Sequence, residues 1–400
     1  MNRRRVKITG IGPVTPAGIG REAFWKGILE PVSRVTKIKR FPEEAGTFLA
    51  AEVKDFRLEN YAPGVSSKRM PRHTQFAVAG AQLALADAGL EMSELRGRSP
   101  LVMVGASLMD FGSINKGVDL IVRKGVNNAL PTSVFSASVS SISGTIGELI
   151  GGTTRTLALQ SACCAGSDAI GHAANMVASG ETDIALCGGT ESPLYFHPML
   201  ELRMAGLAPG NPENPERQCR PFDLWRTTGV IGEGACIFVL EPEESPRPGY
   251  AFVSGYSFVS DPLENPGGGF GDAIKLALAN ASLRPDQIEC INAWGPGHKV
   301  IDAAEARALA KAFGHNLASI PAVSIKGAIG NPLGAGGAIQ AACAILGARA
   351  GVVAPTVNWQ FPDPACPLNL CGRSRFIPHR NVLVNAHGLS GTNACLVLTQ

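Results

Sequence analysis

The sequence predicts an α/β fold made of stacked layers of helices and sheets. Apolar runs typical of strands alternate with helical patterns along the chain, which is the signature of layered α/β folds. Of the 400 residues, 45% are hydrophobic and 17% are charged, so an extensive core is expected. The chain is also long enough for two domains of ordinary size or one large duplicated domain.

The first half contains a strand-helix-strand pattern. Thr156–Gln160 is predicted as a strand, the residues after Cys163 to about Ala178 as a helix, and Ile184–Cys187 as the next strand. Such a unit would form a buried pair of parallel strands with a crossover helix. It would also place Cys163 at a strand-to-helix turn.

The second half continues the alternation and ends in a hairpin. Ile288–Asn292 and Ala322–Lys326 are predicted as strands, and Asp302–Phe313 and Gly334–Leu346 as the helices that follow them. Val382–Val384 and Leu396–Leu398 are predicted as the two strands of the hairpin. Strands separated by helices of this length indicate a second layered unit.

A proline-rich segment, Glu244–Gly249, marks the best boundary between the two halves. Directly after it, Tyr250–Gly255 resembles the opening run Arg5–Gly10, and both are strand-like runs that end in glycine. We therefore predict a weak internal duplication, with an N-terminal half at 1–245 and a C-terminal half at 246–400.

Cys163 stands where a nucleophile is expected. Unpaired backbone N–H groups at a helix N-terminus, with the positive end of the helix dipole, favour a thiolate and can hold a developing oxyanion. Gly166 and its small neighbours would let a substrate chain and a second backbone segment come close. The alternative is a buried, inert thiol, which is the commonest state of a single cysteine.

Charge and cysteine content exclude several classes of function. A formal net charge of +3 is too small to argue for binding of nucleic acid or a membrane surface. The ten cysteines are scattered, and several lie in strand-like runs, which suits reduced core thiols. Cys366 and Cys371 have no His or Cys pair at zinc-ligand spacing beside them, so we interpret them as structural and expect no metal.

Two further patterns carry no site. Gly10–Pro13 follows a predicted strand but lacks the third glycine of a dinucleotide fingerprint, and its proline would disturb the helix entry, so no nucleotide cofactor is expected. Val6–Gly10 is too short and too polar for the core of a signal peptide. No later stretch has the roughly 18 uncharged apolar residues that a membrane-spanning helix needs. We therefore expect a cytoplasmic protein without a membrane span.

Four separated motifs resemble those of a known family. They are Ser161–Ser167, Arg220–Asp223 with Gly232–Ala235, Ser324–Gly327 followed by Leu333–Ala335, and Gly391–Asn393. In order and spacing they resemble the β-ketoacyl-ACP synthase family (KAS I/II-like) of the thiolase superfamily, and the similarity spans nearly the whole chain. The resemblance implies a duplicated thiolase fold of five layers, αβαβα, that dimerises through its sheets.

The resemblance also implies an activity and partners. The family condenses an acyl chain bound to its cysteine with malonyl-ACP. It therefore implies Cys163 as the nucleophile and acyl carrier protein, bearing an acyl or malonyl thioester, as a partner. It implies a homodimer or a heterodimer with a ketosynthase, and it requires no cofactor. Whether the pathway makes fatty acids or polyketides stays open.

The chain departs from the family pattern at both catalytic histidines. The first histidine position holds Trp294, with His298 four residues on, and the second holds Asn331. Trp offers one N–H and no basic nitrogen, while Asn donates hydrogen bonds but exchanges no proton near neutral pH. Lys326 and Glu305 match the family lysine and its acidic companion. They are either a buried charge pair that braces the site or direct catalytic parts.

The loops around the pocket differ as well. The family's Gly-Phe-Gly-Gly-Thr-Asn reads Gly-Leu-Ser-Gly-Thr-Asn here, so Leu389 replaces the gating phenylalanine, and Gly388 and Thr392 are expected beside the substrate. His387 precedes this motif and is either a relocated base or a filler of the phenylalanine site that bonds a backbone carbonyl. In the other loop, the family's Arg-Asp-Gly-Phe is replaced by Arg226–Gly229.

Two hypotheses follow for the function. In the first, the chain is an acyltransferase of fatty-acid or polyketide elongation that forms a thioester on Cys163. In the second, it is a non-catalytic subunit similar to chain-length factors, which pairs with an intact ketosynthase and shapes the acyl tunnel. The retained Cys163 favours the first, and the bulk of Trp294 favours the second. In both, the segment 131–151 is expected at the dimer interface.

Overall fold

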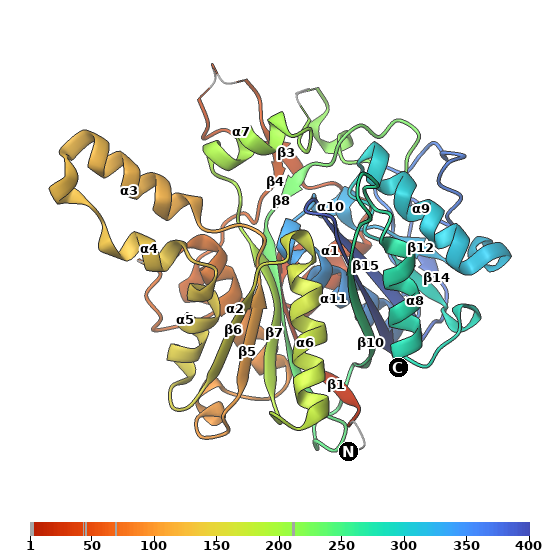
Figure 1. Ribbon diagram of the computed structural model, residues 1–400, viewed down its shortest axis with the longest axis horizontal. Coiled ribbons are helices and arrows are strands. Elements are labelled where there is room, and N and C mark those ends of the chain that lie inside the picture. Colours follow the sequence, from red (N-terminus) through yellow and green to blue (C-terminus); the bar gives the residue numbers. More distant parts are fainter. Residues whose placement is uncertain (1–3, 43, 45, 69, 210–212) are drawn as a thin grey trace.

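The computed structural model describes residues 4–400 except 43, 45, 69 and 210–212. Within these residues one large mixed sheet runs through the molecule (Figure 1). Its N-terminal half consists of β6 (Arg155–Leu159), β5 (Leu101–Gly105), β7 (Ala185–Glu191), β9 (Gly234–Pro242) and β1 (Val6–Thr15). Its C-terminal half consists of β10 (Ala251–Ser260), β16 (Thr392–Thr399), β15 (Val382–Gly388), β11 (Cys290–Asn292) and β12 (Ala322–Val323).

The two halves meet where β1 and β10 pair antiparallel, at Lys7 with Phe252 and Ile8 with Ala251. Short strands complete the topology: β2 (Gly18–Ile19) on β1, the small sheet β3 (Val35–Lys37), β4 (Leu49–Ala51) and β8 (Ile231–Gly232), and the pair β13 (Val352–Val353) and β14 (Arg375–Phe376).

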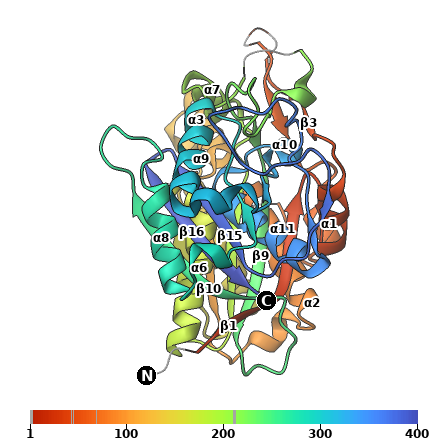
Figure 2. The same cartoon turned by 90° about the vertical axis from the view of Figure 1, so that its right-hand side faces the viewer.

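Helices cover both faces of each half-sheet, which gives the five layers of a thiolase-like fold with N- and C-terminal halves. The outer layers are α2 (Arg72–Asp87) with α5 (Ser140–Ile150), and α8 (Phe270–Asn280) with α9 (Lys299–Phe313). The central layer contains α6 (Ala165–Ser179) and α11 (Gly336–Ala350), whose side chains share one core with both half-sheets. Figure 2 shows α8 and α9 on one side of the molecule and α2 on the other.

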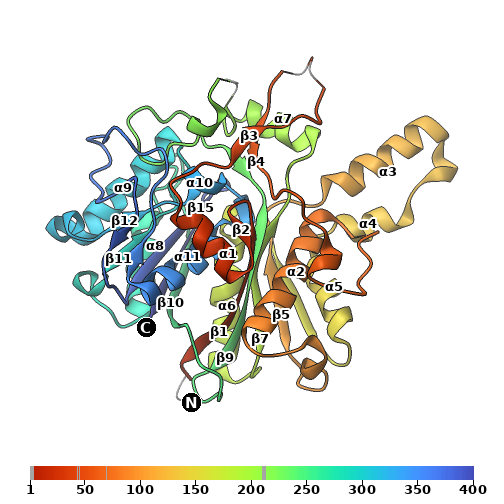
Figure 3. The same cartoon turned by 180° about the vertical axis from the view of Figure 1, so that it is seen from behind.

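The remaining helices lie around this body. They are α1 (Arg21–Leu29), α7 (Phe196–Met204), α10 (Lys326–Ile329), and the pair α3 (Phe111–Lys124) and α4 (Pro131–Ala137). Figure 3, from behind, shows α1 on the face opposite α6, and α3 with α4 projecting from the body as an arm. Asp110 caps the start of α3, where its carboxylate accepts a hydrogen bond from Ser113 N.

The two strands that open the halves, β1 and β10, resemble each other in sequence and also share a register shift in their pairing with neighbouring strands. Both strands continue past the glycines, so the expectation that they end there was wrong. A register shift falls between Ile8 and Gly10 in β1, and another between Val253 and Gly255 in β10. At each glycine a helix packs directly on the strand: a Cβ on Gly10 would lie 2.0 Å from Ala84 O of α2. These glycines serve helix packing.

Two other predicted strands need correction. Thr156–Gln160 and Ile184–Cys187 do not pair with each other, because β5 lies between β6 and β7 and pairs parallel with both. β6 is also an exposed edge rather than a buried strand. The strand predicted at Ala322–Lys326 ends at Val323, because Ser324 N bonds Thr356 Oγ1 instead of a neighbouring strand and the chain turns into α10.

The other predicted elements agree with the structure. The helix after Cys163 and the C-terminal hairpin are confirmed as α6 and as β15 with β16, and the ten cysteines are all free thiols. One segment, Leu333–Ala350, is long and apolar enough to cross a membrane by length and composition, and 89% of it is buried within the protein. It contains α11, the central core helix.

Candidate active site

Cys163 lies in a single 3₁₀ turn, Ala162–Cys164, between β6 and α6. Ala162 has a φ of +51°, a left-handed conformation that costs free energy for any residue with a Cβ. The side chain of Cys163 is 6% exposed. Gly166 permits the expected close approach, because a Cβ there would lie 2.7 Å from Gly334 O. The turn thus fixes the thiol against backbone from the C-terminal half.

The thiol of Cys163 is protonated at neutral pH. Burial and the nearby carboxylate of Glu191 raise its pKa to about 12. The helix N-terminus was expected to favour the thiolate, and that expectation was wrong because desolvation of a buried sulfur outweighs the helix dipole. Backbone N–H groups of Leu389 and of Cys163 itself act in the opposite direction by donating to the sulfur. Backbone N–H groups beside a nucleophile are the kind of donor that can stabilise an oxyanion.

Cys164 points away from the site. Its Sγ lies 3.4 Å from Thr392 O of β16, to which the thiol donates, and its side chain is fully buried. Burial raises its pKa well above the usual range. Cys163 lines the cavity described next, and Cys164 does not.

That cavity has a volume of about 310 Å³ and brings together residues from both halves of the chain. Sequence-predicted residues on its wall are Cys163, Trp294, His298, Asn331, His387 and Leu389, together with Gly229 from the Arg226–Gly229 loop. Apolar residues complete it, including Leu207, Ile231, Ile301 and Leu333. Four other predicted residues do not line it: Lys326, Glu305, Gly388 and Thr392.

Gly388 and Thr392 shape the backbone beside the nucleophile rather than the cavity itself. A Cβ on Gly388 would lie 2.9 Å from Cβ of Ala162 and 3.3 Å from Cys163 N, so only glycine fits there. Thr392 Oγ1 donates to Ser161 O at 3.2 Å, which ties β16 to the turn that carries the thiol.

Trp294 is held from two sides. Glu305 accepts hydrogen bonds from Trp294 N at 2.8 Å and from Gly295 N at 2.9 Å. Lys326 Nζ donates to Trp294 O at 3.2 Å and lies 3.9 Å from the centroid of the indole ring, a cation–π contact. The ring fits only because residue 336 is glycine: a Cβ there would lie 2.7 Å from the indole.

Lys326 and Glu305 were expected to form a buried charge pair or to act directly. The described residues show no ion pair between them within 4.0 Å, and each binds the Trp294–Gly295 segment instead. Both are fully buried. Burial lowers the pKa of Lys326 to about 7, while the charge of Glu305 acts in the opposite direction. Burial raises the pKa of Glu305.

His387 is positioned by a hydrogen-bonded chain that ends on a carboxylate. Asn393 Nδ2 donates to Asp261 Oδ1 at 2.7 Å, which turns Asn393 Oδ1 towards His387 Nδ1 at 3.0 Å. Nδ1 therefore carries the proton and donates, and Nε2 keeps its lone pair. Among the described residues, Nε2 has no hydrogen-bond partner. Burial lowers the pKa of His387, so the ring is neutral at pH 7.

His298 is the second imidazole on the cavity wall. It caps the start of α9, where Nδ1 accepts from Ile301 N at 3.5 Å. Burial and the charge of Arg226 lower its pKa, as does the positive charge that His387 carries when it is protonated. Arg226 forms an ion pair with Asp363, with 2.5 Å between Nη1 and Oδ2. The two histidines of the cavity are therefore uncharged at neutral pH.

Sequence reasoning missed two carboxylates of the site. Asp261 follows β10 directly and is held by Gly267 N at 2.7 Å and Gly269 N at 2.9 Å. Glu191 ends β7 and accepts hydrogen bonds from Ser107 N at 2.8 Å and Gly334 N at 3.1 Å. Burial raises the pKa of Glu191 to about 7. Each residue ends a strand at the edge where Cys163 lies, a position that favours functional residues.

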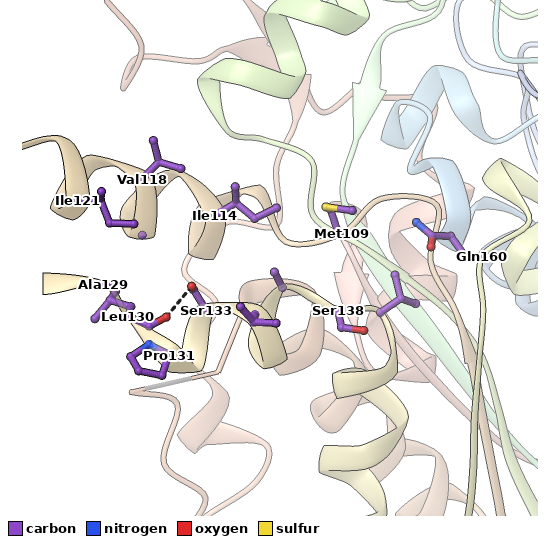
Figure 4. A pocket seen from close by; sticks show the side chains of 14 residues that line it. Met109, Ile114, Val118, Ile121, Ala129, Leu130, Pro131, Ser133, Ser138 and Gln160 are labelled. Atoms are coloured by element: carbon purple, nitrogen blue, oxygen red, sulfur yellow. Dashed lines mark hydrogen bonds between the residues drawn. The ribbon is translucent and has the colours of Figure 1, made fainter. Parts of the chain in front are cut away.

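A second cavity, of about 620 Å³, lies in the arm between α3 and α4. Figure 4 shows α3, with Ile114, Val118 and Ile121, opposite the segment that carries Leu130 and Ser133, and all five residues line the cavity. The outer surface of the arm is apolar as well: among its exposed side chains are Val122, Val126, Val134 and Phe135. Within the described residues, no group of three His, Cys, Asp or Glu side chains is placed to hold a metal ion.

Comparison with known proteins agrees with this geometry. Residues 3–245 match the family model for the beta-ketoacyl synthase N-terminal domain, and residues 250–360 match the model for its C-terminal domain. A 3-oxoacyl-[acyl-carrier-protein] synthase 2 from Coxiella burnetii is 32% identical over 414 residues, covering 100% of this chain and 99% of the relative.

Solved structures show the same likeness. The ishigamide ketosynthase/chain length factor superposes with a TM-score of 0.92 at 30% identity, covering 100% of this chain and 99% of that chain. A type II polyketide acyl-carrier protein in complex with its ketosynthase, AntDE:AntF, superposes with a TM-score of 0.90 at 28% identity, covering 99% of each chain. Both halves of the chain, its fold and its full-length relatives lead to one conclusion: this protein belongs to the β-ketoacyl synthase family.

Proposed function

We propose that this chain is an acyltransferase of the β-ketoacyl-ACP synthase type, which accepts an acyl group on Cys163 from acyl carrier protein in fatty-acid or polyketide elongation. The observation that carries the proposal is the placement of the Cys163 thiol on the wall of a cavity, where the backbone N–H groups of Leu389 and of Cys163 itself donate to the sulfur. Thioester exchange needs a nucleophile of this kind with N–H donors beside it.

His387 is the proposed base for this step. Because the pKa of the Cys163 thiol is raised, thioester formation needs a group that removes its proton. The sulfur attacks the carbonyl carbon, the bond from that carbon to the carrier's sulfur breaks, and the carrier leaves as a thiol with the proton that His387 accepted. The free Nε2 of His387 on the cavity wall supports this role.

Decarboxylative condensation by this chain alone is expected to be slow. An enolate formed from malonyl-ACP needs preorganised hydrogen-bond donors, each worth about 10²–10³ in rate. The resemblance places Trp294 and Asn331 where the family has histidines, and both residues line the cavity. Trp294 uses its backbone N–H on Glu305, so only the indole N–H could donate to a substrate.

The alternative is a subunit similar to a chain-length factor. Two observations favour it: the indole ring of Trp294 occupies the wall beside Cys163, and a ketosynthase/chain length factor is among the similar solved structures. In that role the chain would shape the acyl tunnel of an intact ketosynthase partner and would need no chemistry of its own.

Either function is proposed to operate in a dimer. β6 is an open edge strand with Leu157 47% exposed, and the arm of α3 and α4 next to it exposes Val122, Val134 and Phe135. An apolar surface of this kind on a folded protein marks an interface. The partner is a second copy of this chain or a ketosynthase.

An activity assay separates the two functions. The purified chain is supplied with acyl-ACP and malonyl-ACP, alone and with any ketosynthase that co-purifies with it, and chain elongation is followed by mass spectrometry. A catalytic chain loses elongation with Cys163→Ala in either setting. A chain-length-factor-like subunit elongates only as a complex, and the complex with Cys163→Ala keeps most of its activity. Elongation by the chain alone at ordinary synthase rates would contradict the expected loss of condensing ability.

A further inference from the structure

A buried carboxylate, Asp168, contacts the turn that carries Cys163. Asp168 lies in the first turn of α6, and its side chain is 5% exposed. Helical side chains tilt towards the helix N-terminus, so Asp168 reaches back to the residue that precedes the nucleophile turn. There Ser161 Oγ donates to Asp168 Oδ2. Asp168 therefore ties the start of α6 to the start of the turn.

A tyrosine from the other half of the chain binds the same carboxylate. Tyr256 Oη of β10 donates to Asp168 Oδ1 at 2.8 Å, and both side chains are buried. Figure 1 shows α6 beside β10. One carboxylate oxygen thus accepts from Ser161 in the N-terminal half, and the other accepts from Tyr256 in the C-terminal half.

The ring of Tyr256 is itself held in place. It packs on α6 at Gly171, where a Cβ would lie 2.1 Å from the ring. Gly171 follows Asp168 by three residues, so the two lie on one face of the helix. The rings of His172 and Phe258 also contact Tyr256, with centroids 5.3 Å and 5.9 Å away. A ring packed in this way has little freedom to move its hydroxyl away from the carboxylate.

Strand β10 also supports the proposed base. Asp261 directly follows this strand and accepts from Asn393 Nδ2, and Asn393 Oδ1 faces His387 Nδ1. Tyr256 and Asp261 are five residues apart, which is about 17 Å along an extended strand. One strand therefore contacts both the carboxylate that binds the nucleophile turn and the chain that orients the imidazole.

We propose that Asp168 is a positioning residue that fixes the Cys163 thiol relative to the imidazole of His387. It does so by joining Ser161 to Tyr256, and thereby the nucleophile turn to β10. The inference rests on the proposed function, in which the imidazole takes the proton of the thiol. That transfer needs hydrogen-bond distance between the two groups, and a misplacement of about 1 Å can lower a rate by about 10²-fold.

The test measures how fast octanoyl-N-acetylcysteamine, a small thioester, acylates Cys163 at pH 7 in full-length variants. Asp168→Ala removes both hydrogen bonds. Asp168→Asn is the conservative rescue, because one hydroxyl can donate to the amide oxygen and the other can accept from the amide nitrogen. Intact-protein mass spectrometry gives the maximal rate and the thioester concentration at half that rate.

A matched pair of tyrosine variants avoids the loss of a buried carboxylate. Tyr256→Phe removes only the hydroxyl that binds Asp168 and keeps the ring in place. Tyr250→Phe is the control, because its hydroxyl donates to another carboxylate, Asp87 Oδ1, at 3.0 Å, and neither residue lines the cavity of Cys163.

We expect Asp168→Ala to lower the maximal acylation rate about tenfold or more, and Tyr256→Phe to lower it about threefold or more. The half-saturating concentration should stay within about twofold, because the contact holds the thiol and not the thioester. Asp168→Asn and Tyr250→Phe should react within about twofold of the unmodified protein. The double variant Asp168→Ala/Tyr256→Phe should be no slower than Asp168→Ala, because both residues act through one contact.

A reaction without a base separates positioning from a general disturbance of the fold. Alkylation of Cys163 by iodoacetamide at pH 10 needs a thiolate and access, and its rate should change less than about threefold in Asp168→Ala. Equal losses in acylation and alkylation would overturn the proposal. If circular dichroism shows that Asp168→Ala does not fold, the comparison of Tyr256→Phe with Tyr250→Phe decides.

The outcomes also separate this inference from the proposed function. If the unmodified protein gains the acyl group and both Asp168→Ala and Tyr256→Phe gain it equally fast, the positioning role fails and the acyltransferase function stands. If the unmodified protein gains no acyl group from the small thioester or from acyl-ACP, the proposed function fails, and the inference that rests on it fails as well.

Discussion

At the scale of single residues, the size of Trp294 determines much of the site. Trp294 lines the cavity that contains Cys163, and Nζ of the buried Lys326, which does not line it, lies 3.9 Å from the centroid of the indole ring. The ring needs the space that Gly336 leaves in α11. Trp294 and Gly336 therefore act as a packing pair, and replacing either one alone should disturb the other.

This pair gives a stability prediction. Gly336→Ala places a methyl group 2.7 Å from the indole ring, so we expect the free energy of unfolding to fall by about 1–3 kcal/mol in chemical denaturation. Gly271→Ala in α8 is the matched control, because no atom lies within 4 Å of its added Cβ, and it should be neutral or slightly stabilising. Equal effects of the two substitutions would contradict the packing account.

The raised pKa of Cys163 gives a second prediction, about its reactivity. With a pKa of about 12, the thiolate fraction at pH 8 is on the order of 1 in 10,000, so alkylation by iodoacetamide should accelerate about tenfold for each unit from pH 8 to 10. Peptide mapping is done with Cys371→Ser, because Cys371 is the most accessible of the ten thiols. Modification mainly at Cys164, or a rate that ignores pH, would contradict the assignment.

His387 gives a pH dependence with a defined sign. A base must be unprotonated, and burial lowers the pKa of His387 below its ordinary value of 6.5. Acylation of Cys163 should therefore keep its rate as the pH falls to about 6.5 and lose it at lower pH, when the imidazole becomes protonated. The measurement is the initial acylation rate from pH 5 to 8. A decline that begins well above pH 7 would exclude this imidazole as the base.

Only part of the site could be predicted from residues in the sequence. Cys163 was accessible because a strand, a turn and a helix surround it, and the cavity also contains the predicted Trp294, Asn331 and His387. Asp261 could not be assigned to His387, because the contact passes through Asn393 across 132 residues of sequence. The raised pKa of the thiol could not be predicted either, because it depends on burial and on Glu191.

At the scale of elements, strands and helices differ in how well the sequence predicts them. α6 and the hairpin of β15 with β16 have clear local patterns and agree with the prediction. The chain leaves the sheet after Val323 and turns into α10 at Lys326, because the hydrogen bonds of Ser324 go to Thr356 and Gly295 and not to a neighbouring strand. Long-range partners of this kind leave no periodic signal in the sequence.

The arm of α3 and α4 gives a prediction about assembly. Val134 and Phe135 are 75% and 76% exposed on α4, so Val134→Asp/Phe135→Asp should weaken the proposed dimer by placing two charges in its interface. Light scattering at micromolar concentration should show a smaller species. Phe376→Asp, at a side chain 90% exposed on β14, is the control and should leave the mass unchanged. An unaltered dimer in the arm variant would place the interface elsewhere.

At the scale of the whole molecule, two similar halves enclose one site. The paired strands β1 and β10 carry the same irregularity against their helices, and the central helices α6 and α11 share one core. Cys163 comes from the N-terminal half, whereas Trp294, Asn331 and His387 come from the C-terminal half. The sequence motifs were sufficient for the fold and the family, but the way in which the halves meet at the cavity required the structure.

The central claim is that Cys163 accepts an acyl group with His387 as its base. The most direct test is intact-protein mass spectrometry of the purified chain over time with acyl-ACP. We expect a single acyl adduct on the unmodified protein and on Cys164→Ser, none on Cys163→Ala, and formation slowed about 10²-fold or more with His387→Ala. An unmodified protein that never gains the acyl mass, or an adduct that persists in Cys163→Ala, would contradict the account.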